Sequence, residues 1–130
     1  MNEGNREIMV RQQMDKANLF LGQADEMCTL RHWDLAANRY YYACFHAVQG
    51  LFISEGISAH THAGLISQFS LNFVKTNKVS VSSGSFLARL MQLRQKADYN
   101  CAFDITEEEV KEIAPLAHNF VKAIQSLIHL

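Results

Sequence analysis

The chain has 130 residues, of which 48% are hydrophobic and 19% are charged, and its formal net charge is −1. This length fits one domain over residues 1–130, and the single proline and six glycines favour helices over many short strands. The near-zero net charge excludes a general basic field for nucleic acid, so any such contact has to be local.

The first two helices are predicted from hydrophobic periodicity and from their end signals. The first starts near Asn5 and runs for about 25 residues, because apolar residues recur at spacings of four and three. The second begins near Asp34, which we expect to be its N-cap, and ends at Gly56, where glycine can adopt a left-handed conformation. The stripe of the first helix consists of Val10, Met14, Ala17, Leu21, Ala24 and Cys28.

Three further segments follow. A third helix is predicted over roughly His62 to Lys75, and the polar, serine-rich segment TNKVSVSSGS that follows reads as a loop. A fourth helix is expected from about Ser85 through Asp98. The last helix has a capping box, in which Thr106 caps and Glu109 reaches back, and Pro115 should kink this helix without breaking it.

These segments have short connections and no strand pattern. They predict an all-α fold, an up-down four-helix bundle with an additional short helix.

The second helix carries a polar stripe on an otherwise apolar cylinder. Arg39, Tyr42, His46 and Gln49 align at spacings of three, four and seven residues, and the small residues Ala43 and Gly50 lie on the same face. One interpretation is a partly solvated face without a role. The other is a groove for an anionic ligand, in which arginine binds phosphate, tyrosine stacks on a base and histidine exchanges a proton.

The fourth helix also carries aligned polar residues. Arg94 and Asp98 are four residues apart on the side that should face the bundle, so they are either a structural ion pair or part of the same binding site. We expect no metal and no cofactor, because His60 and His62 lack a cysteine or carboxylate partner at zinc spacing. His62 is expected to start the third helix or to pack above Ile66.

The compartment is inferred from the cysteines and the N-terminus. Cys28, Cys44 and Cys101 are an odd number without metal-ligand spacing, which is typical of free thiols in a reducing environment. The first residues lack the pattern of a secretion signal, and no run approaches the roughly 18 apolar residues of a membrane span. We therefore expect a soluble cytoplasmic protein.

The segments AANRYYYACFHAVQGLF, THAGLISQF, LRQKADYN and AHNFVKAI together resemble the HEPN superfamily, in particular its small stand-alone prokaryotic members. The resemblance covers nearly the whole chain. It implies an up-down bundle of four helices with an additional short helix, usually a homodimer, often encoded beside a minimal nucleotidyltransferase in a toxin-antitoxin pair.

The resemblance also bears on catalysis. Many HEPN proteins are metal-independent ribonucleases with an arginine followed, after four to six residues, by a histidine. Arg94 matches that arginine by location, but Tyr99 stands where the histidine would be, and a tyrosine with a pKa of about 10 is a poor base near neutral pH. Arg39 and His46 have the ribonuclease spacing, but on the second helix, either by coincidence or as a displaced site.

Three functions remain open from the sequence. The first is a binding module for a nucleotide, RNA or a nucleotidyltransferase partner. We expect its ligand-binding residues to be Arg39, Tyr42, His46, Arg94 and Asp98. The alternative is a metal-independent ribonuclease toxin with Arg94 and Tyr99 as its candidate catalytic residues, in which Arg94 stabilises phosphate charge and Tyr99 or His46 assists proton transfer. The third is a structural partner that only completes a nucleotidyltransferase.

Overall fold

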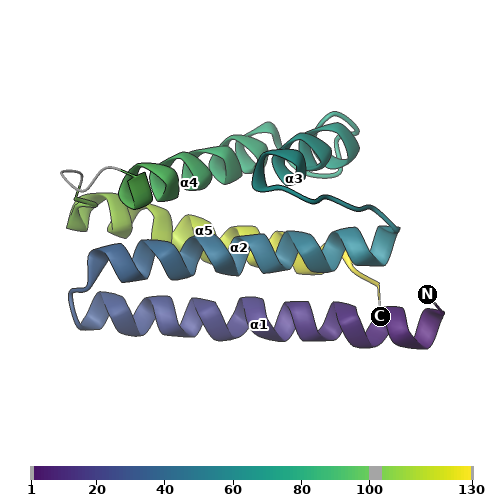
Figure 1. The fold of residues 1–130 in the computed structure, drawn as a ribbon, viewed down its shortest axis with the longest axis horizontal. Helices are drawn as coiled ribbons and strands as arrows, with labels where there is room; N and C mark the ends of the chain where they lie inside the picture. The colour runs from purple at the N-terminus through teal and green to yellow at the C-terminus, as the bar shows by residue number, and fades with distance from the viewer. Residues whose placement is uncertain (1, 100–103, 130) are drawn as a thin grey trace.

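The structure is a computed structural model that describes residues 2–99 and 104–129. Within these ranges the chain is helical and contains no strand. The helices are α1 (Glu3–Thr29), α2 (Trp33–Glu55), α3 (His62–Phe69), the π-helical turn η1 (Ser70–Val74), α4 (Val81–Tyr99) and α5 (Glu107–Leu127). Successive long helices α1, α2, α4 and α5 run in opposite directions, and the short α3 lies at one end (Figure 1). This arrangement confirms the predicted up-down bundle.

Helix α2 is the central element. It packs along α1, against α5 and against α4, so its circumference is largely covered. On the faces of α2 beside its polar stripe, Phe45 is partly buried and the following side chains are buried: Tyr40, Tyr41, Cys44, Ala47, Val48, Leu51 and Phe52. No helix in the described ranges is both long and apolar enough to cross a bilayer.

The start of α2 differs from the prediction. His32, without a side-chain hydrogen bond, occupies the N-cap position, and Asp34 lies inside the first turn. The Asp34 carboxylate instead accepts the backbone N–H of Ile105 at 3.2 Å, so a tertiary contact with the segment before α5 replaces the expected local cap. The end of α2 is as predicted, because Gly56 adopts a left-handed conformation with φ 71°.

Helix α4 begins at Val81 rather than at Ser85, so the second half of the predicted loop is helical. The Ser80 hydroxyl accepts a hydrogen bond from the backbone N–H of Ser83 at 3.2 Å and so caps the start of this helix. The serine-rich composition, which predicted a loop, gave no indication of this cap. Gly84 is needed inside this helix, because a Cβ atom there would lie 2.9 Å from the Val74 side chain. The serine-rich segment therefore contains both a loop and a closely packed first turn.

The predicted starts of α3 and α5 are confirmed. Thr61 caps α3, which starts at His62 and continues through η1, close to the range expected for the third helix. The capping box of Thr106 and Glu109 is present, and α5 continues through Pro115 without a break. The expectation of a free thiol at Cys101 lies outside the described residues.

A polar bridge fastens α1, α2 and α5 together on a side of α2 other than that of its polar stripe. The Tyr40 hydroxyl donates to Asp25 Oδ1 at 2.5 Å, and His118 Nε2 lies 2.9 Å from the same oxygen. Burial raises the pKa of Tyr40 far above its ordinary value, so the phenol remains a donor. The buried tyrosine is thereby satisfied within the bundle.

Candidate functional site

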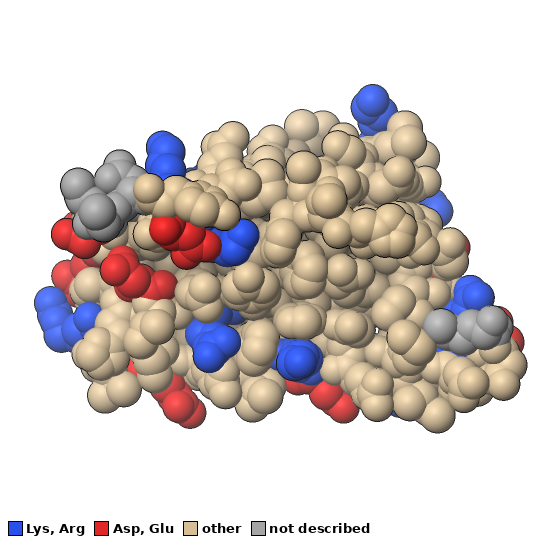
Figure 2. Space-filling model, viewed as in Figure 1, with Lys and Arg blue, Asp and Glu red and all other residues tan. Residues whose placement is uncertain are grey.

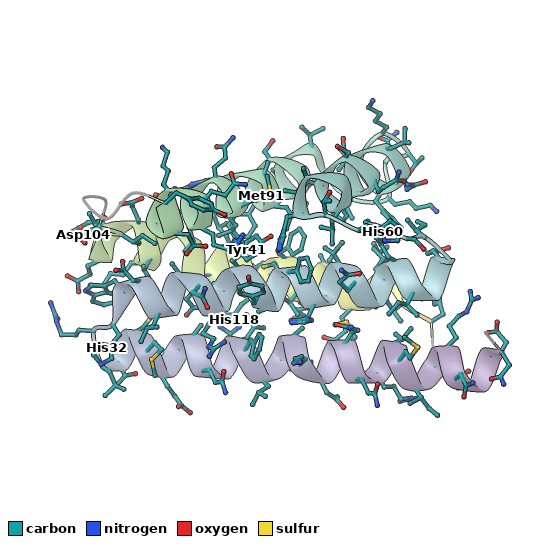
Figure 3. All side chains as sticks on the ribbon, viewed as in Figure 1. His32, Tyr41, His60, Met91, Asp104 and His118 are labelled. Atoms are coloured by element: carbon teal, nitrogen blue, oxygen red, sulfur yellow. The ribbon has the colours of Figure 1, made fainter. Side chains whose placement is uncertain are left out.

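Six residues from α1, α2 and α4 form a continuous row of side-chain contacts, here called the polar strip. Its members are Phe20, Arg39, Tyr42, His46, Arg94 and Asp98. All five ligand-binding residues expected from the sequence are therefore brought together. Figure 3 labels Tyr41 of α2 and Met91 of α4, and the Arg94 guanidinium of the strip lies 5.2 Å from the Tyr41 ring centroid.

Arg39 lies at one end of the strip. Its guanidinium carbon is 4.9 Å from the centroid of the Phe20 ring, a cation–π geometry. Among the described residues it has no ion pair and no hydrogen bond, and none of its nitrogens is buried without a partner. Its N–H donors are therefore open to solvent, and a bidentate phosphate contact is free to form.

His46 shares Phe20 with Arg39, because the Phe20 and His46 ring centroids are 5.4 Å apart. Its Nδ1–H donates to Gln13 Oε1 at 2.7 Å. Burial, with a smaller effect from Lys16, lowers the His46 pKa from its ordinary value of 6.5, so the ring is neutral at pH 7. The sequence analysis missed Gln13, since nothing in the pattern of α1 relates this residue to a histidine 33 positions away.

Arg94 lies at the other end and is more enclosed. Its guanidinium carbon is 5.2 Å from the Tyr41 ring centroid and 5.7 Å from that of Tyr42. Its Nη1 donates to the Tyr42 hydroxyl at 3.3 Å and to Asp98 Oδ2 at 3.2 Å, and its side chain is 16% exposed. The Nε atom is buried without a partner. Arg94 is therefore a structurally paired arginine with one unsatisfied donor.

A cavity of about 280 Å³ adjoins this end of the strip between α2 and α4. Arg94 and Asp98 form its polar wall together with Asn38. The rest of its lining is mainly apolar: Leu35, Ala37, Leu90, Leu93, Ala97 and Ile105, with Asp34 at the edge. An apolar cavity with a few convergent polar groups is the usual form of a small-ligand site.

His62 is a second histidine that the structure adds to this region. Its Nδ1 atom is hydrogen-bonded to the Tyr41 hydroxyl, and its ring lies 4.9 Å from that of Phe45. Burial, and then the positive charge of Arg94, lower the His62 pKa from 6.5. The sequence correctly placed His62 at the start of a helix, but it gave no sign that α3 would carry this ring to Arg94.

Tyr99 does not join the strip. It is the last residue of α4 and is 84% exposed, and among the described residues it makes no hydrogen bond, ion pair or ring contact. A search of the described residues for three or more His, Cys, Asp or Glu side chains placed to hold a metal ion finds no such group. The groups available here are thus two arginines, two neutral histidines, the hydroxyls of Tyr41 and Tyr42, and the rings of Phe20 and Phe45.

Known proteins are similar to this chain over most of its length. The model of the HEPN domain family matches residues 10–127. A UPF0332 protein of Thermotoga maritima is 39% identical over 93 residues, which are 72% of this chain and 70% of that protein. Two proteins of Methanocaldococcus jannaschii named as candidate toxins are 28% identical over 108 residues and 34% identical over 93 residues. These alignments cover 83% and 72% of this chain, and 74% and 69% of the respective relatives.

Proposed function

The chain belongs to the HEPN domain family, and from this premise we propose that it is a binding module for a phosphate-bearing ligand, RNA or a nucleotide. The ligand lies along the polar strip, with its phosphates on Arg39 and a base against Tyr42 and the neighbouring cavity. Sequence-tolerant RNA binding commonly combines arginine contacts to phosphate with stacking of bases on aromatic rings.

The observation that carries this proposal is that the Arg39 guanidinium has no hydrogen-bond or ion-pair partner among the described residues. An arginine with exposed donors, fixed over Phe20 and lacking a carboxylate partner among the described residues, is ready to bind an anion. Its neighbours on the strip, His46 and Tyr42, offer a neutral ring and an aromatic face. A solvated face without a role would not need a fixed guanidinium at this point.

The assembly forms part of the proposal. The view in Figure 2 shows a face on which side chains other than Lys, Arg, Asp and Glu cover most of the surface. Because the cores of protein interfaces are depleted of charged residues, such a face supports a homodimer, in which we propose that the strips of two copies lie near one another.

A biological role follows from the family. Two relatives are named as candidate toxins, which supports a role as a toxin. We further propose, as the resemblance to the family implies, a cytoplasmic toxin-antitoxin pair with a minimal nucleotidyltransferase as partner. Co-purification with the product of the adjacent reading frame tests this role. A nucleotidyltransferase that fails to associate with this chain would contradict it.

Fluorescence anisotropy with a labelled single-stranded RNA tests the binding function. Arg39→Ala should weaken binding by about tenfold or more, because a charged hydrogen bond to phosphate is lost. Arg89→Ala is the matched control, since it removes an equal charge from an exposed ion pair with Glu112 outside the strip. Wild-type protein that binds neither RNA nor nucleotide would overturn the proposal, as would equal effects of both variants.

A ribonuclease toxin is the second candidate, and one observation favours it. His46 is neutral, its Nε2 atom carries a free lone pair, and Arg39 precedes it with the spacing of the family's ribonuclease signature. A neutral imidazole can accept the proton of a 2′-hydroxyl group near pH 7. Against this candidate, Arg94 is already occupied by Asp98.

A further inference from the structure

The two histidines near the strip hold opposite tautomers. Gln13 Oε1 can only accept, so Nδ1 of His46 carries the proton and its Nε2 is an acceptor. For the second histidine the order is reversed. Burial raises the pKa of Tyr41 to about 12, and the hydroxyl hydrogen of Tyr41 has no other acceptor among the described residues, so Nδ1 of His62 accepts. Its Nε2–H is therefore a donor.

Both free nitrogen atoms are accessible. No described group bonds the Nε2 atom of His46 or His62, and neither atom is among the buried polar atoms that lack a partner. The two rings also flank the same pair of aromatic side chains. Each lies 6.4 Å from Tyr42 by ring centroids, and they lie 5.5 Å and 4.9 Å from Phe45, respectively.

The Nε2 lone pair of His46 restricts which chemical groups of a ligand can lie beside it. Through shared contacts with Phe20 and Tyr42, His46 lies between Arg39 and Arg94 in the row of the strip. A phosphate oxygen cannot bond the His46 lone pair, because both groups are acceptors. A strand with a phosphate on Arg39 therefore presents a donor at His46, which is either a base N–H or a donor of its backbone. The backbone of RNA has one donor per nucleotide, the 2′-hydroxyl group, and the backbone of DNA has none.

We infer that His46 Nε2 accepts a hydrogen bond from a ribose 2′-hydroxyl group, so that the strip selects RNA over DNA, while His62 Nε2–H donates to an adjacent phosphate oxygen. This inference rests on the proposed function, because it assumes that a strand binds along the strip. Gln13 and Tyr41 are then positioning residues that fix which nitrogen of each histidine is protonated.

The test compares three labelled uridine strands of about 12 nucleotides, a length within the range of single-strand binding sites. One strand is RNA, one is 2′-deoxy and one is 2′-O-methyl, and anisotropy gives the affinity of the wild-type protein for each. RNA should bind about three- to tenfold more tightly than both others, the range expected for one hydrogen bond. Equal affinity for the three strands would overturn the inference and leave the proposed function standing, whereas no binding to any strand would overturn both.

A pair of variants assigns the effect. His46→Phe keeps an aromatic ring against Phe20 but removes the acceptor, so RNA and the 2′-deoxy strand should bind equally. His60→Phe, at an exposed histidine outside the strip, should keep the preference for RNA. A preference that survives His46→Phe would contradict the assignment. The comparison of strands with wild-type protein decides the inference even if this variant does not fold.

Discussion

Arg94 and Asp98 form an ion pair across one turn of α4, with Arg94 Nη1 3.2 Å from Asp98 Oδ2. The carboxylate thus partly neutralises Arg94, whereas Arg39, at the other end of the strip, is paired among the described residues with an aromatic ring alone. An anion that approaches Arg94 has to compete with Asp98. The two arginines of the strip are therefore not equivalent.

Asp98→Asn should strengthen RNA binding, because it removes the carboxylate that competes for Arg94. The loss in unfolding free energy should be no more than about 1 kcal/mol, as expected for an ion pair whose acidic partner is 45% exposed. RNA titrations and thermal melts measure the two effects. Glu112→Gln, which frees Arg89 outside the strip, is the control, and an equal gain in both variants would indicate a general charge effect.

Arg39→Ala should leave the melting temperature nearly unchanged, because no described carboxylate loses its partner. Lost packing on Phe20 is the main contribution, and it should cost about 1 kcal/mol or less. Thermal melts followed by circular dichroism measure this. A loss of roughly 3 kcal/mol that is restored in the double variant with Asp98→Ala would instead identify a buried ion pair.

Ribonuclease activity is expected to be weak or absent. Tyr99 is exposed and isolated among the described residues, and the Arg94 side chain is already bonded to Asp98 and Tyr42. Incubation of purified protein with structured and single-stranded RNA in a chelator, followed by electrophoresis, tests this. Robust cleavage that Arg94→Ala abolishes would establish the second candidate function, and its loss in His46→Phe would then identify the base.

The protein should be a homodimer in solution. The mass expected from light scattering at micromolar concentration is about twice the 14.8 kDa of one chain. A mass that stays at that of one chain over a tenfold increase in concentration would contradict this prediction.

The unfolding free energy should fall as the pH decreases below about 6.5. Burial lowers the pKa of both His46 and His62, so the unfolded chain binds protons at 6.5 while the folded protein binds them only at lower pH. Stability is then fully present above 6.5 and is lost as the pH falls toward the lowered values. Urea titrations between pH 5 and 7.5, within the window set by these pKa shifts, measure the slope.

The share of one histidine in this slope can be isolated. His46→Phe should reduce the dependence of stability on pH, because it removes one of the two histidines whose pKa burial lowers. A slope that is the same in wild-type protein and in His46→Phe would show that the lowered pKa of His46 does not contribute.

The sequence by itself determined the helices and the side of α2 that carries the polar residues. Both depend on interactions within a few residues: hydrophobic periodicity, the capping box at Thr106 and the left-handed Gly56. The same locality explains why Arg39, Tyr42 and His46 could be recognised as one stripe, and why Arg94 could be paired with Asp98 four residues later.

Only the tertiary structure decided what these residues meet. Gln13 bonds a histidine 33 positions away, and Tyr41 bonds one 21 positions away. Instead of capping α2, the Asp34 carboxylate accepts a hydrogen bond from the backbone N–H of Ile105, 71 positions away. The protonation of His46 and His62 and the accessibility of Arg39 depend on such contacts between helices. Periodicity fixes the face on which a side chain lies, but the packing of separate helices fixes its partner.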